Sequence, residues 1–223
     1  MKILLGILTA CLYLASFVTC AQAGSLEIVN TIHLYYGSLT TLTAKFEQKL
    51  FHKESGAVEI RSGNLTFKKP MNIFWQTMKP QKEQWIGTEQ ELWDYLPDEE
   101  VAYRYSSAVL KQSGGIFGLL TGQTSLEDEY SIKQAGTEKD LVKLLLLPKE
   151  PTMQLVEARI WVEREGAIQK IHCKDFYGNT NEIILSNLKK NMEIKQSLFS
   201  FKVPKGVEVE DLRNSDLQKG IFQ

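Results

Sequence analysis

The residues able to carry out acid–base or metal chemistry are few and scattered along this sequence. Its three histidines are His33, His52 and His172, and none stands at metal-ligand spacing from another histidine or from a cysteine. The chain contains neither a Gly-x-Ser-x-Gly elbow nor a glycine loop that could cradle phosphate. We therefore expect no catalytic residue, no metal site and no cofactor, and we expect that the protein is not an enzyme.

Two further groups of residues could take part in chemistry, but each has a simpler explanation. Acidic side chains cluster at residues 98–100 and 127–129, where adjacent carboxylates are typical of solvated turns rather than of an acid–base pair. The tryptophans could stack on sugars or bases, although aromatic residues in strands usually belong to a core. They are Trp75, Trp85, Trp93 and Trp161. Neither group points to a reaction.

The first 23 residues have the three parts of a cleavable secretory signal. Lys2 gives a basic start, residues 3–18 are apolar, and Ala21-Gln22-Ala23 provides the small side chains that signal peptidase requires. A competing interpretation makes Cys20 the acceptor of a lipid anchor, but Thr19 fits poorly because such sites favour a small residue before the cysteine. We expect cleavage after Ala23 and a soluble protein in the periplasm.

Composition indicates one domain without a nucleic-acid partner. Removal of the signal leaves 223 − 23 = 200 residues, which we assign to a single domain at 24–223. Because Lys2 is lost, 25 of the 26 basic residues remain against 27 acidic ones, with the two signs interleaved. Cys11 and Cys20 lie in the signal, so Cys173 has no partner for an internal disulfide and is expected to be a small core residue.

From residue 43 onward, apolar residues alternate with polar ones, as in strands with one buried face. In the first strand, at 43–51, Phe46 shares a face with Ala44, Gln48 and Leu50. Further strands are expected at 63–69, 73–77, 84–87, 92–96, 101–105, 131–134, 141–147, 156–164, 168–176, 180–188 and 199–203. So many consecutive strands indicate an antiparallel sheet, most simply joined as a meander.

Two segments could cover such a sheet. Residues 25–36 place apolar side chains at helical spacing and are followed by a stop at Gly37-Ser38. In residues 106–129 the alternation disappears, and glycines bracket the apolar pairs Ile116-Phe117 and Leu119-Leu120. Because these pairs would form an exposed patch in water, we interpret the segment as a lid. The sheet then has either an ordinary two-layer core or an apolar cavity beneath this lid.

The order of these features resembles the LolA type of periplasmic outer-membrane lipoprotein carrier over nearly all of residues 25–211. The likeness rests on short stretches, whose number and order make it specific. They are Phe46-x-Gln48, residues 62–70 (Ser-Gly-Asn-Leu-Thr-Phe-Lys-Lys-Pro), Phe74-Trp75, Leu92-Trp93-x-Tyr95-x-Pro97, residues 116–122 (Ile-Phe-Gly-Leu-Leu-Thr-Gly), and the ending Phe199-x-Phe201-x-Val203-Pro204-x-Gly206-Val207-x-Val209.

This resemblance implies a mainly β fold with a few helices, in which an open half-barrel of antiparallel strands has a concave apolar face. The N-terminal helix and the lid would cap that face, which would hold the acyl chains of lipoproteins. A monomer would take them from an inner-membrane transporter to an outer-membrane receptor. The cavity residues expected are Phe46, Phe67, Ile73, Trp75, Ile116, Phe117, Leu119 and Leu120. The alternative is a LolA-like carrier or sensor for another lipid, glycolipid or acyl compound.

Lys69 departs from the family pattern. The family typically has an arginine here, which hydrogen-bonds to the lid and helps to hold it closed. Lysine offers one compact ammonium in place of a planar fork with five donors. The resemblance therefore implies that Lys69 is the lid latch, and that it holds the lid less firmly than arginine.

Overall fold

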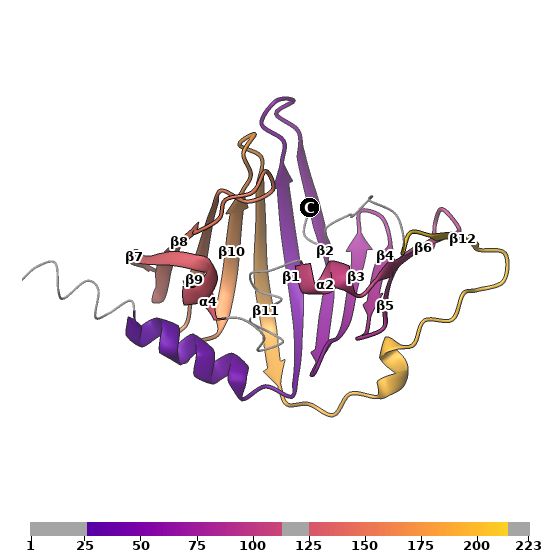
Figure 1. Ribbon diagram of the computed structural model, residues 1–223, viewed down its shortest axis with the longest axis horizontal. Coiled ribbons are helices and arrows are strands. Elements are labelled where there is room, and N and C mark those ends of the chain that lie inside the picture. The colour runs from indigo at the N-terminus through magenta and orange to yellow at the C-terminus, as the bar shows by residue number, and fades with distance from the viewer. Residues whose placement is uncertain (1–25, 113–124, 214–223) are drawn as a thin grey trace, which may run out of the picture.

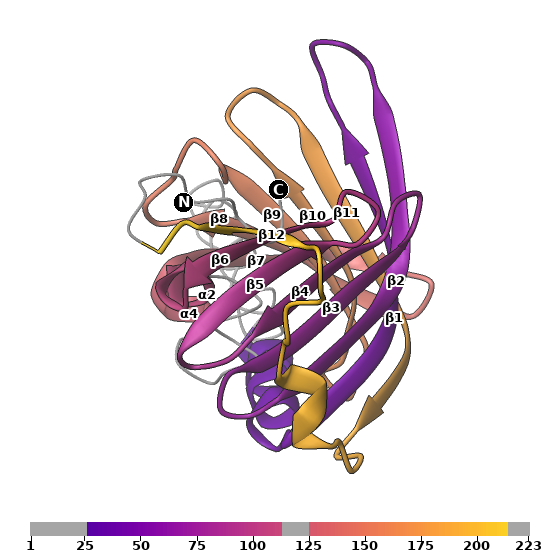
Figure 2. The same ribbon diagram turned by 90° about the vertical axis from the view of Figure 1, so that its right-hand side faces the viewer.

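The computed structural model describes residues 26–112 and 125–213, and its main feature is one large β-sheet (Figure 1). Twelve strands lie in the order β12-β6-β5-β4-β3-β2-β1-β11-β10-β9-β8-β7, so β12 and β7 form the two edges. Neighbouring strands are antiparallel, except that β12 runs parallel to β6. The sheet curves around helices that lie in its hollow (Figure 2). The expected mainly β, open antiparallel architecture is confirmed.

Two meanders meet in the middle of this sheet. The first consists of β1 (Thr41–Phe51), β2 (Val58–Lys68), β3 (Asn72–Lys79), β4 (Glu83–Gly87), β5 (Glu91–Leu96) and β6 (Val101–Ser106). The second consists of β7 (Tyr130–Glu138), β8 (Leu141–Pro148), β9 (Glu157–Val162), β10 (Ile168–Lys174) and β11 (Thr180–Lys190). Pairing of β11 with β1 joins the two meanders. Helices α2 (Ala108–Gln112) and α4 (Leu126–Glu129) stand between them, and the 3-10 helix η1 (Gln196–Phe199) and β12 (Glu208–Asp211) follow.

The alternation along β1 explains why the hollow of the sheet is apolar. Phe46 is buried, whereas its neighbours Lys45 and Glu47 are more exposed, on the outer face. Successive side chains of a strand point to opposite faces, and residues paired across strands share a face. Phe46 lies opposite Gly63 in β2 and Leu185 in β11, so the same face continues into both neighbours.

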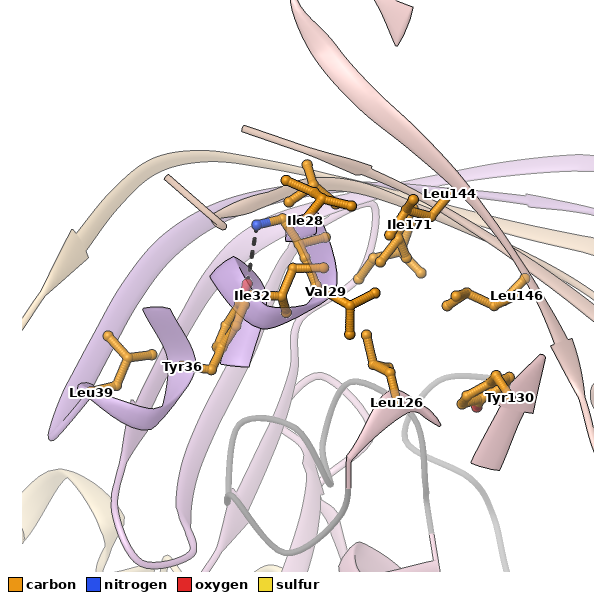
Figure 3. Packing of buried hydrophobic residues seen from close by; sticks show 14 of the residues in the cluster. Ile28, Val29, Ile32, Tyr36, Leu39, Leu126, Tyr130, Leu144, Leu146 and Ile171 are labelled. Atoms are coloured by element: carbon orange, nitrogen blue, oxygen red, sulfur yellow. Dashed lines mark hydrogen bonds between the residues drawn. The ribbon is translucent and has the colours of Figure 1, made fainter. Parts of the chain in front are cut away.

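The N-terminal helix, residues 26–37, covers the part of the hollow that β8, β9 and β10 form (Figure 3). Ile28 and Ile32 are buried against the sheet, as the helical spacing predicted. Tyr36 is buried beside them, and its hydroxyl oxygen accepts a hydrogen bond of 3.2 Å from the backbone N–H of Ile168. Burial raises the pKa of the Tyr36 phenol above its ordinary value. This hydrogen bond fixes the helix to β10.

The helix also approaches the turn between β9 and β10 very closely. A Cβ atom at Gly166 would lie 2.4 Å from the carbonyl oxygen of Thr31 in the helix. Gly166 has a φ of +93°, which residues with a side chain rarely adopt. Glycine is thus required here both by the turn and by the helix that lies on it.

The outer face of β4 to β6 has a small apolar cluster of its own, which the chain after β11 covers. The ring of Phe201 lies 5.1 Å from that of Trp93 and 5.2 Å from that of Tyr95. The strand predicted at residues 199–203 is therefore wrong: η1 ends at Phe199, and an irregular segment then crosses the sheet face. The alternation of that segment reflects packing onto β5 rather than a hydrogen-bonded ladder.

Candidate binding face in the hollow of the sheet

The part of the hollow that the N-terminal helix does not cover holds a second apolar cluster, here called the β1–β6 cluster. The first meander supplies most of its side chains, and β11 and α2 supply the others. Its members are Ala44, Phe46, Leu65, Met71, Ile73, Trp75, Trp85, Leu92, Tyr105, Val109, Leu110, Ile183 and Leu185. The cluster beneath the N-terminal helix, here called the helix cluster, is distinct from it. The hollow therefore has two apolar halves with different covers.

Aromatic rings run across the β1–β6 cluster from strand to strand. The ring of Phe46 lies 4.3 Å from that of Trp75, and Trp75 stands opposite Trp85 in the ladder between β3 and β4. Trp85 in turn stacks on Tyr105 at 5.9 Å. A Cβ atom at Gly63 would lie 1.8 Å from the carbonyl oxygen of Gln76 and 3.0 Å from the Phe46 ring, so glycine is required on β2 mainly by the neighbouring backbone. Together the rings provide a wide apolar surface.

The described cover of this half is small. Helix α2 has five residues, and Val109 and Leu110 are buried against the cluster. Gly87 makes room for this contact, because a Cβ atom there would lie 2.7 Å from Leu110 Cδ1 and 2.7 Å from Ile73 Cγ2. A five-residue helix covers far less apolar surface than the N-terminal helix covers in the other half. Among the described residues, the two halves of the hollow therefore differ in the size of their cover.

Polar groups lie at the β5–β6 end of the same face. Asp94 is buried between Trp85 and Tyr103, its partners across the two ladders. Burial, together with the nearby carboxylate of Asp94, raises the pKa of the Tyr105 phenol above its ordinary value. The face is thus mainly apolar at β1 to β3, where Gln48 and Thr77 are buried polar residues, and it carries a carboxylate and phenols toward β6.

Two of the sequence-based expectations, one on metal binding and one on Cys173, concern the described part of the chain. Residues 26–112 and 125–213 contain no cluster of three or more His, Cys, Asp and Glu side chains that could hold a metal ion. Cys173 packs against the helix cluster, and burial raises the pKa of its thiol to about 11. At neutral pH this cysteine is a thiol rather than a nucleophilic thiolate. The helices within those two ranges are all too short or too polar to cross a membrane.

Comparison with known proteins identifies the family of this chain. Residues 37–202 match the family described as outer membrane lipoprotein carrier protein LolA. The chain belongs to the LolA family. Outer-membrane lipoprotein carrier proteins of Ralstonia nicotianae and Chromobacterium violaceum are each 29% identical to it. The alignments cover 88% of this chain and 91% of the first protein, and 94% and 98% for the second.

A solved structure shares the fold at much lower sequence identity. It is described as an uncharacterized conserved protein from Thermus thermophilus, and it is 11% identical with a TM-score of 0.55. The superposition covers 83% of this chain and 98% of that chain. The two proteins therefore share a fold despite their low sequence identity.

The structure places the described residues of the expected LolA cavity on one continuous face. Phe46, Ile73 and Trp75 lie together in the β1–β6 cluster. Phe67 is fully buried, but it belongs to the helix cluster. The lid residues Ile116, Phe117, Leu119 and Leu120 lie outside the described residues, so their part in the cavity stays a prediction.

Lys69 has a role that the LolA resemblance did not suggest. Its ammonium donates hydrogen bonds to the carbonyl oxygens of Tyr36, at 3.1 Å, and of Gly37, at 3.0 Å. These carbonyls end the N-terminal helix, where a positive charge is favourable. A contact between Lys69 and residues 113–124 of the lid would lie outside the described ranges, so the latch stays a prediction.

Other residues of the face were not predicted from the sequence. Three of them lie on strands that were expected, namely Trp85, Leu92 and Tyr105. The alternation of buried and exposed residues could have assigned these side chains to the inner face if the strand register had been known. Ile183 and Leu185 come from β11, which pairs with β1 from more than a hundred residues away. No local signal in the sequence reports such a pairing.

Proposed function

We propose that this LolA-family protein carries the acyl chains of lipoproteins through the periplasm, from the inner to the outer membrane. Residues 1–23 would be removed on export, leaving one domain. The observation that carries the proposal is the β1–β6 cluster, a continuous apolar face with a row of aromatic rings and a five-residue helix as its described cover. The names of the related proteins from Ralstonia nicotianae and Chromobacterium violaceum support the same role.

The two halves of the hollow have different tasks in this proposal. The helix cluster is permanent core, because the N-terminal helix is fixed by the Tyr36 hydroxyl and by its close contact at Gly166. The β1–β6 cluster takes the acyl chains when the lid segment, which includes α2, moves aside. Each buried methylene contributes about 0.8 kcal/mol, so a tight slot for whole acyl chains would release them very slowly. Reclosing of the cover on the empty face favours release.

An inner-membrane transporter would load the protein and an outer-membrane receptor would unload it. Such a carrier must hold acylated cargo in solution. The test contains no vesicles: a fluorescent triacylated lipopeptide is mixed with the mature protein and separated by size-exclusion chromatography. We expect the lipopeptide to elute with the protein, and the same peptide without acyl chains to elute separately. Lipopeptide that never elutes with the protein, at any protein concentration, contradicts the proposal.

Lys69→Arg should weaken lipopeptide binding and speed its transfer to an acceptor. Two of the three ammonium protons of Lys69 already serve the helix end, whereas the five donors of arginine could serve helix and lid together. One or two added charged hydrogen bonds contribute about 1.5–3 kcal/mol each at most, so we expect about a tenfold change. Affinity and transfer rate are measured on the same preparations.

The matched control for this prediction is Lys68→Arg. Lys68 is the preceding residue, and its ammonium donates instead to the carbonyl oxygen of Ile194 at 3.2 Å. This variant should behave like the parent protein. Identical affinity and transfer rate for Lys69→Arg and the parent would mean that residue 69 does not act on the lid.

A further inference from the structure

The turn between β10 and β11 exposes two neighbouring aromatic side chains. Phe176 is 65% exposed and Tyr177 is 66% exposed, and their rings pack edge to face at 5.8 Å. Met153, in the loop between β8 and β9, is 48% exposed, and its carbonyl oxygen accepts a hydrogen bond of 3.1 Å from the Phe176 N–H. We call these three residues the aromatic tip. Single exposed apolar residues are ordinary, but three together form a patch.

The turn that carries these rings is firmly built. The carboxylate of Asp175 accepts hydrogen bonds from the backbone N–H of Asn179, at 2.8 Å, and from its side-chain amide, at 2.7 Å. The amide oxygen of Asn179 accepts a further bond of 2.9 Å from the backbone N–H of Lys53, in the loop between β1 and β2. The turn is thus tied to a neighbouring hairpin. The two rings are therefore exposed by an ordered turn and not by a loose loop.

The aromatic tip stands at an end of the sheet where the chain projects. The hairpins β1–β2 and β10–β11 reach beyond the other strands at the top of Figure 1. The β8–β9 loop belongs to the same edge, because β8 and β10 run in the same direction there. The tip therefore lies at the projecting edge of the sheet, beside the longer β1–β2 hairpin, where it can touch a broad flat surface (Figures 1 and 2).

We propose that the aromatic tip inserts into the interfacial layer of a phospholipid bilayer. Three partly exposed side chains offer on the order of 300 Å² of apolar surface. A stable protein interface needs about 800 Å² from each partner. Reversible attachment to a bilayer needs a much smaller apolar surface, because a few aromatic rings at headgroup depth are enough. This attachment would hold the carrier at a membrane surface while cargo enters or leaves, so its role in transfer rests on the proposed function.

Charge around the tip indicates an apolar rather than an electrostatic attachment. In the three loops of this edge, the exposed lysines Lys53 and Lys149 are balanced by the exposed acids Glu54 and Glu150. A balanced set gives little net attraction to anionic lipid headgroups. Binding through the tip should therefore persist in about 0.5 M salt, where the Debye length is only a few ångströms.

The test is flotation of the mature protein with vesicles of phosphatidylethanolamine and phosphatidylglycerol. The parent should float with the vesicles, and Phe176→Ser/Tyr177→Ser should reduce the bound fraction about tenfold or more. The control is Leu26→Ser/Leu34→Ser, which removes two exposed leucines, 55% and 75% exposed, from the N-terminal helix. The control should float like the parent. Thermal unfolding of all three proteins confirms that each is folded.

Several outcomes overturn the proposal. They are a parent that stays at the bottom of the gradient, a tip variant that floats like the parent, and parent binding that disappears in high salt. Lipopeptide binding in solution is measured in parallel and should be the same for the tip variant as for the parent. A parent that floats but binds no lipopeptide would contradict the carrier function and leave the membrane contact standing. A tip variant that floats normally but transfers cargo slowly would indicate a protein partner and overturn the membrane contact.

Discussion

Phe46→Glu should strongly weaken the binding of acyl chains. Phe46 is buried on β1 in the middle of the β1–β6 cluster, with its ring 4.3 Å from that of Trp75. A carboxylate at this position would lose its water whenever an acyl chain covered the face, at a cost of several kcal/mol. Each 1.4 kcal/mol is a factor of about ten, so we expect affinity to fall about a hundredfold or more. Titration with a triacylated lipopeptide measures the change.

The matched control is Phe51→Glu, which makes the same substitution on the same strand. Residues 46 and 51 differ in parity, so the Phe51 side chain lies on the outer face. We expect this variant to bind lipopeptide like the parent. If Phe46→Glu unfolds, the uncharged Phe46→Gln provides the test, with an expected loss of about tenfold. Parent-like affinity in a folded Phe46 variant would exclude the β1–β6 cluster as the site.

Gly166→Ala should destabilise the protein by about 2–6 kcal/mol. A φ of +93° is strained for alanine, at a cost of about 1–3 kcal/mol. The added Cβ would also lie 2.4 Å from the carbonyl oxygen of Thr31, so the N-terminal helix must shift, which costs about 1–3 kcal/mol more. Total stabilities of domains are only about 5–15 kcal/mol, so the effect is large. Urea unfolding measures the loss.

Gly206→Ala separates the two causes of this loss. Gly206 has a φ of +92°, almost the same as Gly166, but no atom lies within 4 Å of the position of its Cβ. The backbone strain is therefore matched, and only the contact with the helix differs. We expect Gly206→Ala to destabilise the protein clearly less than Gly166→Ala. Equal losses would mean that the turn at Gly166 does not fix the helix.

Local pattern predicted much of the architecture because burial of one face imposes a period on the sequence. The spacing of Ile28 and Ile32 predicted the N-terminal helix, and both are buried against the sheet. The alternation around Phe46 predicted β1 and its buried face. Both features depend only on which side of a helix or strand faces the core. The spacing of apolar residues close together in the sequence indicates that side directly.

The two errors at the end of the chain have a common cause. Phe199 and Phe201 alternate like strand residues, yet they cover the outer face of β4 and β5 instead of joining a ladder. Glu208–Asp211 has no buried residue and no apolar period, but it forms β12 beside β6 through backbone hydrogen bonds. The alternation of apolar and polar residues indicates which side chains are buried. It does not reveal which backbone segments pair as strands.

The site was predictable only in part for a related reason. Ile73 and Trp75 are in the β1–β6 cluster, but Phe67, on the adjacent strand, belongs to the helix cluster. Which half a residue joins depends on where the N-terminal helix lies across the sheet. The hydrogen bond from the Ile168 N–H to the Tyr36 hydroxyl sets that position across 132 residues of sequence, and no local signal contains it.

The central claim is that acyl chains lie on the β1–β6 cluster, and the tryptophans allow a direct measurement. Trp75 and Trp85 belong to this cluster, whereas Trp93 packs under Phe201 on the outer face. Trp161 lies between Lys143 and Lys170, which pair with it across its ladders on the outer face. Bromine atoms on an acyl chain quench only tryptophans that they approach closely.

The measurement is the quenching of tryptophan fluorescence by a lipopeptide with brominated acyl chains. We predict strong quenching of the parent, little or no quenching of Trp75→Phe/Trp85→Phe, and retained quenching of Trp93→Phe/Trp161→Phe. Each variant is first shown to bind the unbrominated lipopeptide. Quenching that survives in Trp75→Phe/Trp85→Phe and disappears in Trp93→Phe/Trp161→Phe would place the acyl chains on the outer face and contradict the account.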